Sequence, residues 1–325
     1  MRALMMLAAG GAENSRVEDV EIPRPGPGDV SIEVAYAGLN FMDVMSRRGD
    51  PGYVAGWPHR PGLEVSGTVR EVGPQVTGPA VGDVVAASIP AGGGMAEIAV
   101  ARAELTVPVP AGVPLAVAAG TPAGFVSALL LLEAGRFTAG ETVLVHSASG
   151  GVGSAVAQFA RALGGGRLLG TVGRPEKVEA AVEAGYDTVV ARGQAAAESL
   201  RTAGGVDLVL DPLGTSALDF DLDIAAPRAR IVLFGNASGG EIGALPPVGR
   251  LIGGNLTLTG FSHRATAATA PQLIAAATTR TLDLVAAGSV EFPVTVVDSL
   301  DEVPGIHDRL AAGTGSGKYV VRIGR

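Results

Sequence analysis

Residues 143–164 read VLVHSASGGVGSAVAQFARALG, which predicts a short buried strand, a glycine-rich turn and then a helix. The turn from Ala148 to Gly153 follows the Gly-x-Gly-x-x-Gly pattern, with Ala148 in the first glycine position. In this pattern Gly150 lets the backbone approach a pyrophosphate, and Gly153 lets the helix pack closely on the strand. The N–H groups at the start of the helix then face the phosphates. The residues expected to bind a dinucleotide here are Ser149, Gly150, Gly151, Val152 and Gly153.

Strands and helices alternate along the chain around this motif. Such alternation predicts a doubly wound parallel sheet, and therefore an α/β fold. A glycine-rich turn in an unrelated α/β domain is the alternative, but a position between a buried strand and a helix favours dinucleotide binding. His146 lies inside the buried strand, so we expect it to be a core residue. Further strands are expected at 167–172, 188–191, 206–210, 230–235 and 255–260.

The end of the second strand carries positive charge. Enzymes that prefer NAD usually have Asp or Glu there, about 20 residues after the glycine turn, to bind the ribose hydroxyl. This chain has Gly173 and Arg174, with Lys177 close behind, and no acidic residue before Glu176. Arg192 follows the third strand and adds another cation. Cations without a ribose carboxylate favour the 2′-phosphate of NADPH, and ordinary surface cations are the alternative.

The two ends of the chain differ from its middle. Residues 1–121 are rich in turns and in strand-like segments such as 64–72. The tail also has short strand-like segments, so we expect it to complete the same β-rich domain. The predicted organisation is a discontinuous domain of residues 1–121 and 261–325, interrupted by a dinucleotide-binding domain of residues 122–260.

Composition excludes several classes of site. The 325-residue chain has no cysteine, which excludes disulfides, thiol nucleophiles and cysteine zinc sites. Its net charge of −8 argues against nucleic-acid binding, which needs clustered Lys and Arg. The sequence has no run of about 20 apolar residues, so no membrane span is expected. The apolar stretch near the N-terminus is short and continues into a strand-like segment, so we expect a cytoplasmic protein.

Several segments are similar to those of a known superfamily. They include AGLNFMDVMSRRG (37–49), RPGLEVSGTVREVG (60–73), HSASGGVGSAVAQFARALG (146–164) and SGKYVV (316–321). On these motifs the chain resembles the medium-chain dehydrogenase/reductase superfamily, in its zinc-free quinone oxidoreductase (zeta-crystallin-like) branch. The resemblance runs over essentially the whole chain. It implies a GroES-like β-rich catalytic domain and a Rossmann domain that binds NADPH, with the active site in the cleft between them.

The resemblance also bears on metal binding. Zinc-dependent members of the superfamily carry a ligand Cys, and a His before the Glu of the segment that matches PGLEVSG. Here Leu63 precedes Glu64, and the chain has no cysteine. We therefore expect no metal and a zinc-independent reaction.

Individual residues acquire expected roles from the same resemblance. Asn40, in the segment GLNFMD, would lie near the nicotinamide and donate to a carbonyl oxygen as negative charge develops on it. Arg47 or Arg48 would hold an anionic or carbonyl group at the cleft mouth, with a solvated surface position as the alternative. Tyr53 or water would supply the proton that follows the hydride. The remaining residues expected near the cofactor are Gly235, Asn236 and Lys318.

Two residues depart from the pattern of the branch. Met45 stands where many members have Tyr, and Phe125 stands where many have Thr. Together with Tyr53 and Trp57 they predict an apolar, roomy pocket. Such a pocket favours a flat, conjugated carbonyl compound as substrate.

The expected activity is hydride transfer from NADPH to a quinone or an α,β-unsaturated carbonyl compound. Two alternatives stay open: an enoyl-thioester reductase of the polyketide or acyl-CoA type, and a non-catalytic protein that binds NADPH. The segment NLTLTGF (255–261) matches the edge strand through which members of the family pair their sheets. Because an unpaired apolar edge strand favours aggregation, we expect a homodimer.

Overall fold

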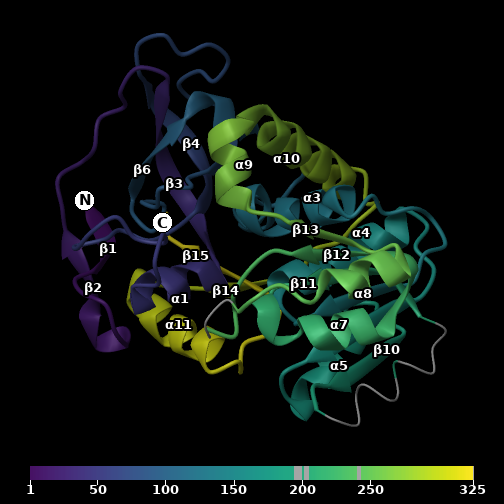
Figure 1. Ribbon diagram of the computed structural model, residues 1–325. Coiled ribbons are helices and arrows are strands. Elements are labelled where there is room, and N and C mark those ends of the chain that lie inside the picture. The colour runs from purple at the N-terminus through teal and green to yellow at the C-terminus, as the bar shows by residue number, and fades with distance from the viewer. Residues whose placement is uncertain (194–199, 201–204, 240–242, 325) are drawn as a thin grey trace. The chain divides into compact units, whose positions relative to one another are not determined.

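The chain forms two compact units in a computed structural model, drawn as a ribbon in Figure 1. Unit 1 consists of Met1–Val126 and His263–Arg325, and unit 2 consists of Ser127–Ser262. The inserted unit therefore begins and ends within a few residues of the predicted limits, 122 and 260. The residues that the structure describes are 1–193, 200, 205–239 and 243–324.

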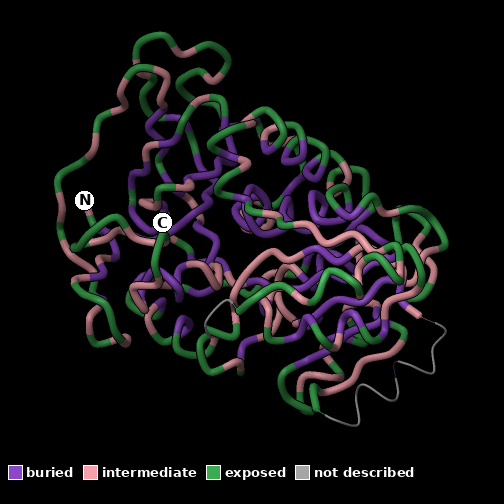
Figure 2. The backbone as a smooth tube through the Cα atoms, in the orientation of Figure 1, coloured by how far each residue is buried: buried purple, intermediate pink, exposed green. Residues whose placement is uncertain are grey.

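Unit 2 is built on a six-stranded sheet. Its strands are β8 (Val143–His146), β9 (Leu168–Val172), β10 (Thr188–Ala191), β11 (Val206–Asp211), β12 (Ala225–Leu233) and β13 (Thr257–Gly260). They lie in the order β10-β9-β8-β11-β12-β13, and every neighbouring pair is parallel. The inner strands β8 and β9 are buried along their whole length, whereas the edge strands β10 and β13 are partly exposed (Figure 2). The predicted α/β fold with a parallel sheet is confirmed.

Helices of unit 2 pack against this sheet. Those described are α3 (Val126–Ala134), α4 (Gly151–Ala162), α5 (Val178–Glu183), α7 (Leu218–Ile224) and α8 (Val248–Gly254). α4 contacts β8, α5 contacts β9 and β10, and both α7 and α8 contact β12. In α4 the buried side chains include Ala155, Val156 and Phe159, whose spacing of three to four residues places them on one face of the helix. This face anchors the helix that follows the glycine turn.

The limits predicted for β12, 230–235, are wrong at both ends. The strand begins at Ala225 and ends at Leu233. Its first residues include Pro227, which has no N–H for a strand ladder, and Arg228, whose φ is 71°. The pairing of β11 with β12 shifts register across this point. The irregular start removed the alternating pattern by which the sequence could have revealed the strand.

Unit 1 is built mainly from antiparallel strands. Its strands are β1 (Arg2–Met6), β2 (Ser15–Asp19), β3 (Asp29–Leu39), β4 (Glu64–Val72), β5 (Val84–Ser88), β6 (Ile98–Arg102), β7 (Thr106–Pro108), β14 (Val294–Val297) and β15 (Lys318–Arg322). The larger sheet has the order β14-β15-β3-β4-β5-β7, with β6 also paired to β3. β1 and β2 form a separate antiparallel pair. The tail strands β14 and β15 therefore complete a sheet begun by the N-terminal segment.

Unit 1 also contains helices that were not predicted from the sequence, among them the one that follows β3. The helices are α1 (Phe41–Arg48), α2 (Leu115–Ala119), α9 (His263–Thr269), α10 (Pro271–Ala286) and α11 (Val303–Ala311). α1 begins directly after β3 and ends at Gly49, whose φ of 78° is the left-handed conformation common at helix ends. Because β3 and α1 are contiguous, Asn40 sits at the junction of the sheet and the helix.

Each unit has its own core. In unit 1 the side chains of β3, β4, β5 and α11 supply a buried cluster that includes Ile32, Val65, Val85 and Val303. In unit 2 the central strands supply another, which includes Leu144, Leu169 and Val209. No helix among the described residues is long and apolar enough to cross a membrane.

Candidate active site

The glycine turn of unit 2 forms a tight cradle between β8 and α4. Gly150 precedes α4 in an extended conformation, and Gly150 to Val152 are partly exposed. A Cβ at Gly153 would lie 2.6 Å from the carbonyl oxygen of Ser147 and 2.7 Å from that of Ala148. These are backbone atoms that cannot move aside, so a glycine is required here. The partly exposed N–H groups at the start of a twelve-residue helix suit a pyrophosphate.

Tyr186 supports this cradle, although it was not among the residues predicted from the sequence. Its hydroxyl donates to the carbonyl oxygen of Gly153 at 2.7 Å. The side chain is buried, and burial raises the pKa of the phenol. Tyr186 lies 33 residues from Gly153 along the chain, so no local sequence signal announces the contact.

Three cations gather at the carboxyl end of β9. Arg174 and Lys177 follow the strand, and the guanidinium of Arg192 lies over Gly173, 2.8 Å from where a Cβ of that glycine would be. Burial, and then the positive charges of Arg174 and Arg192, lower the pKa of the Lys177 ammonium. The two neighbouring guanidinium groups therefore act electrostatically on this ammonium. The cluster is therefore suited to bind an anion of high charge, such as a phosphate monoester.

The loops after β11 and β12 lie together at the same edge of the sheet. The Ser238 hydroxyl donates to the carbonyl oxygen of Leu213 at 2.8 Å and to Oδ1 of Asn236 at 3.1 Å. The N–H of Ala237 donates to the carbonyl oxygen of Pro212 at 2.8 Å. Gly235 and Asn236 therefore sit at the carboxyl ends of the strands, where ligands bind to parallel sheets. Their predicted contact with a cofactor stays a prediction.

A buried polar network lies beneath this edge. Nε2 of His146 is 2.7 Å from Oδ1 of Asp221, and its Nδ1 is 2.6 Å from the hydroxyl of Thr171. Asp211 accepts a hydrogen bond from the N–H of Leu213 at 2.6 Å. Burial, and then the negative charge of Asp221, raise the pKa of Asp211 to about 7. His146 is thus a core residue, as predicted from its place in the strand.

The same network has the spacing of a metal site. Ligand atoms of His146, Asp211 and Asp221 lie within 4.8 Å of one another. However, 2.7 Å between Nε2 of His146 and Oδ1 of Asp221 is the length of a hydrogen bond. Two neighbouring buried carboxyls favour sharing a proton over carrying two charges. The geometry therefore supports a proton-sharing network.

We expect the stability of unit 2 to fall as pH rises from about 4 to about 7. The pKa of Asp211 is raised from 3.8 to about 7, so the folded state keeps a proton that the unfolded state releases. Asp211→Asn needs no proton and should show a higher unfolding temperature than the native chain at about pH 8, with a clearly smaller gain at about pH 5. Thermal unfolding at both pH values checks this. Asp219→Asn, at a side chain that is 92% exposed, makes the same charge change, and an equal gain there would contradict the assignment.

In unit 1, Asn40 is held between two charged groups. Its Nδ2 donates to Oε1 of Glu64 at 2.9 Å, and its Oδ1 accepts from Nζ of Lys318 at 2.8 Å. A carboxylate only accepts and an ammonium only donates, so the two partners fix the orientation of the amide. The amide keeps one further N–H, which can donate to a substrate. Asp43 holds the backbone beneath it, because its carboxylate accepts from the N–H of Asn40 at 2.8 Å.

Glu64 is the centre of this arrangement, although no role was predicted for it from the sequence. Its buried carboxylate also accepts from the N–H groups of Ala123 at 2.7 Å and Gly124 at 3.0 Å. Nζ of Lys318 bonds to Glu64, to Asn40 and to the carbonyl oxygen of Leu39. These three acceptors match the three protons of an ammonium. The predicted contact of Lys318 with a cofactor stays a prediction, but its side chain is committed to positioning Asn40.

Lys318→Met is expected to destabilise unit 1 by about 3–5 kcal/mol, because it leaves the carboxylate of Glu64 buried without its cation. Urea unfolding measures the loss. The double variant Glu64→Gln with Lys318→Met removes both charges and should recover most of it. A double variant no more stable than the single one would contradict a role for the ion pair.

The other residues predicted to contact the substrate differ in how far they are buried. The Arg47 guanidinium is buried, at 2.8 Å from Oδ1 of Asp308, so it does not lie at a cleft mouth as predicted. Tyr53 is half-buried, and burial raises the pKa of its phenol. Met45 is buried, and Phe125 is stacked on Phe292 in the core of unit 1.

The apolar pocket predicted from four side chains therefore does not form as expected. Met45 and Phe125 are 4% and 1% exposed, so they offer no surface to a ligand within unit 1. Trp57 is 36% exposed, and its ring meets that of His59 edge-on, with 6.5 Å between centroids. Tyr53 and Trp57 remain the accessible aromatic side chains of that set.

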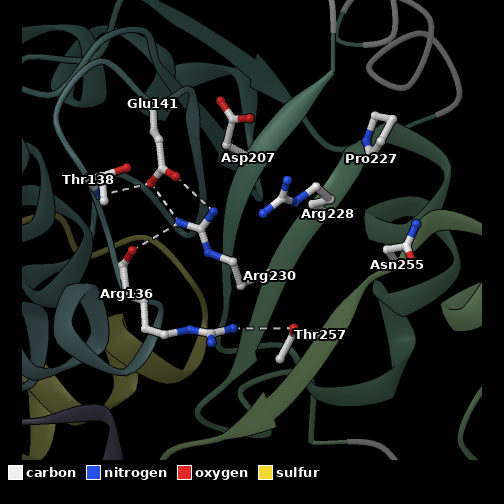
Figure 3. A pocket seen from close by; sticks show the side chains of 9 residues that line it. All are labelled: Arg136, Thr138, Glu141, Asp207, Pro227, Arg228, Arg230, Asn255 and Thr257. Atoms are coloured by element: carbon white, nitrogen blue, oxygen red, sulfur yellow. Dashed lines mark hydrogen bonds and ion pairs between the residues drawn. The ribbon is translucent and has the colours of Figure 1, made fainter.

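A pocket of about 860 Å³ opens at the opposite edge of the sheet of unit 2 (Figure 3). Its lining comes from the amino ends of the strands and the segments before them. Arg230 donates to both carboxylate oxygens of Glu141, at 2.8 and 2.6 Å. The pocket contains none of the predicted site residues. Since parallel sheets bind ligands at their carboxyl edge, we assign this charged pair a structural role.

Comparison with known proteins adds to this geometry. The model of the alcohol dehydrogenase GroES-like domain matches residues 26–111, and the model named zinc-binding dehydrogenase matches residues 151–279. A quinone oxidoreductase of Pseudomonas aeruginosa is 32% identical over 98% of this chain and 99% of that protein. A 2-haloacrylate reductase of a Burkholderia species is 35% identical over 71% of this chain and 72% of that protein.

Solved structures agree over the full length. An Escherichia coli quinone oxidoreductase complexed with NADPH matches with a TM-score of 0.90 and 26% identity, covering 99% of this chain and all of that one. A mycobacterial protein complexed with NADPH matches with a TM-score of 0.89 and 31% identity, over 99% and 100% of the two chains. The first family model confirms the predicted GroES-like domain.

The name of the second family model raises the question of zinc. The chain has no cysteine to supply a thiolate ligand. In unit 1, Leu63 offers no ligand atom, and the carboxylate of Glu64 is bonded to Lys318 and to two backbone N–H groups. The donor set near Asn40 therefore does not fit a zinc site, and its residues are bonded to one another.

Proposed function

Because the chain belongs to the medium-chain dehydrogenase/reductase superfamily, in its quinone oxidoreductase branch, we propose that it is an NADPH-dependent, zinc-independent oxidoreductase. Its acceptor would be a quinone or an α,β-unsaturated carbonyl compound. The observation that carries the proposal is the cluster of Arg174, Lys177 and Arg192 beside the glycine cradle. An anion with two negative charges neutralises such a cluster better than a ribose hydroxyl.

Unit 2 would hold the cofactor through its carboxyl edge. The N–H groups from Gly150 to Gly153 would bind the pyrophosphate, and the three cations would bind the 2′-phosphate. Gly235 and Asn236 would contact the nicotinamide half. When bound, NADPH supplies a hydride to the acceptor.

Unit 1 would stabilise the charge that develops on the acceptor. As the hydride arrives, negative charge grows on a carbonyl oxygen, and the remaining N–H of the Asn40 amide would donate to it. Glu64 and Lys318 hold that amide in one orientation, so no reorganisation is needed during the reaction. A proton from Tyr53 or from water then completes the reduced product. The raised pKa of Tyr53 keeps its phenol protonated and able to donate.

The proposal is tested by following NADPH oxidation, with NADH in parallel, against three acceptors: 9,10-phenanthrenequinone, a cyclic enone and crotonyl-CoA. Turnover of the quinone or the enone with a preference for NADPH supports it. The 2-haloacrylate reductase among the relatives favours reduction of a carbon–carbon double bond as well. Turnover of crotonyl-CoA alone would move the chain to the enoyl-thioester class. Tight NADPH binding without turnover of any acceptor would point to a non-catalytic role.

We propose further that the protein is a homodimer joined through residues 255–261. β13 is the edge strand of its sheet, and its open side is free of any strand among the described residues. Val248 and Ile252 on the preceding helix α8 are 66% and 71% exposed. Covering this edge and these side chains would remove an aggregation hazard. Light scattering after size exclusion that gives the 32.4 kDa mass of one chain would refute the dimer.

A further inference from the structure

A continuous set of contacts in unit 1 leads from Asn40 to the start of α9. Asn40 donates to Glu64, and Glu64 lies opposite Ser88 in the register of β4 and β5. The hydroxyl of Ser88 is 3.2 Å from Nε2 of His263, the first residue of α9. The next residue, Arg264, therefore lies at the same end of the sheet as Asn40.

Arg264 joins α9 to the loop that follows α1. Its Nη1 donates to the carbonyl oxygen of Gly52. The guanidinium also acts on two side chains of the loop, because its charge lowers the pKa of both Tyr53 and His59. In each case burial is the larger effect: it raises the pKa of Tyr53 and lowers that of His59. The hydrogen bond to Gly52 places the guanidinium next to the residue that precedes Tyr53.

The same loop is tied back to Asn40. The N–H of Gly62 donates to Oδ1 of Asp43 at 3.1 Å, while the other oxygen of that carboxylate holds the N–H of Asn40. His59 stands three residues before Gly62 and pairs with Met6 through the backbone. The loop that follows α1, Arg264 and Asn40 thus belong to one connected region of unit 1.

Arg264 is an exposed cation in an acidic chain. A guanidinium has five N–H donors arranged as a fork that matches a carboxylate, and the described residues engage it at the Gly52 carbonyl. Its neighbour Arg48 is instead paired with Asp50, at 2.5 Å. On the loop that Arg264 contacts at Gly52, the partly exposed rings of Tyr53 and Trp57 offer flat apolar surface. Cation and rings together suit a planar molecule with a negative charge at one end.

We propose that Arg264 is a specificity-determining residue and that the acceptor is a conjugated carbonyl compound bearing a carboxylate. Arg264 binds the carboxylate, and Tyr53 and Trp57 contact the flat conjugated part. This inference rests on the proposed function and narrows its substrate class. The sequence suggested that Arg47 holds an anionic group of the substrate, but Arg47 is buried against Asp308. Arg264, 217 positions later, takes this role in the proposal.

The test compares two acceptors that share a conjugated ketone, the carboxylate 3-benzoylacrylate and its uncharged ethyl ester. Each is offered to the native chain, Arg264→Ala, Arg264→Lys and Arg70→Ala. Arg70 is an exposed arginine on β4 and controls for the loss of one positive charge. Arg264→Ala is expected to lower kcat/KM for the acid about 10- to 100-fold, mainly through KM, and for the ester less than about threefold. Arg264→Lys should recover part of the loss, and Arg70→Ala should behave as the native chain.

A binding measurement separates this inference from the proposed function. The unreactive acid 3-benzoylpropionate is titrated into the NADPH-loaded native chain and into Arg264→Ala, by calorimetry. If the variant binds the acid at least about tenfold more weakly, the inference is supported. This holds even if no acceptor is reduced, an outcome that would refute only the proposed function. The inference would be overturned if both chains bind the acid equally, or if Arg264→Ala lowers kcat/KM equally for the acid and the ester. Turnover of either acceptor would still support the proposed function.

Discussion

Replacing Asn40 with alanine is expected to lower kcat by about 10²–10³ while changing KM little. The amide donates to charge that is present mainly in the transition state, so its removal affects the chemical step more than substrate binding. Glu64 and Lys318 would remain bonded to each other in the variant, which limits the effect on folding. Steady-state kinetics with saturating NADPH and the best acceptor measures the change.

Two matched variants separate catalysis from structure at this position. Asn40→Ser keeps an oxygen suited to the start of α1 but lacks the amide donor, so it should lose activity and keep its unfolding temperature. Asn40→Asp places a second carboxylate beside Glu64 and should lose more activity than the alanine variant. A chain in which Asn40→Ala leaves kcat unchanged would refute the assigned role, provided that NADPH oxidation depends on the acceptor.

Local features of this fold could be predicted because neighbouring residues determine them. The β8–turn–α4 unit rests on contacts between adjacent segments, and β10 was predicted with its observed limits, Thr188–Ala191. α1 was missed although it carries local signals. Asn40 is followed three residues later by Asp43, and Gly49 ends the helix. These are start and stop signals of a helix, so the sequence contained the information for α1.

The chemistry of the site depends on contacts that a sequence pattern does not contain. Glu64 lies 24 positions from Asn40 and 254 positions from Lys318, yet its carboxylate bonds to both side chains. Only the pairing of β15 with β3 brings Lys318 beside Leu39 and the start of α1. For Arg47 the sequence suggested contact with a substrate. Its guanidinium instead pairs with Asp308, which lies 261 positions away in the sequence.

The triple variant Arg174→Ala, Lys177→Ala, Arg192→Ala is expected to lower the preference for NADPH over NADH by about 10³-fold. Each charge-assisted hydrogen bond to a phosphate contributes about 1.5–3 kcal/mol, and 1.4 kcal/mol corresponds to tenfold. The three cations lie close together, so their contributions to binding will not be additive. The sum of the three free energies is therefore an upper limit. NADH has no 2′-phosphate, so its kcat/KM should change little. The ratio of kcat/KM for the two cofactors measures the effect directly.

Arg167→Ala provides the matched control for this prediction. Arg167 precedes β9 at the amino end, where its Nη2 donates to the hydroxyl of Thr188 at 3.3 Å, whereas Arg174 follows the same strand at its carboxyl end. Arg167→Ala and the triple variant both remove positive charge beside β9, but only the carboxyl end of a parallel sheet receives the cofactor. Arg167→Ala should therefore leave the NADPH preference unchanged. If the triple variant affects NADPH and NADH equally, the cluster serves the fold of this edge and does not select the cofactor.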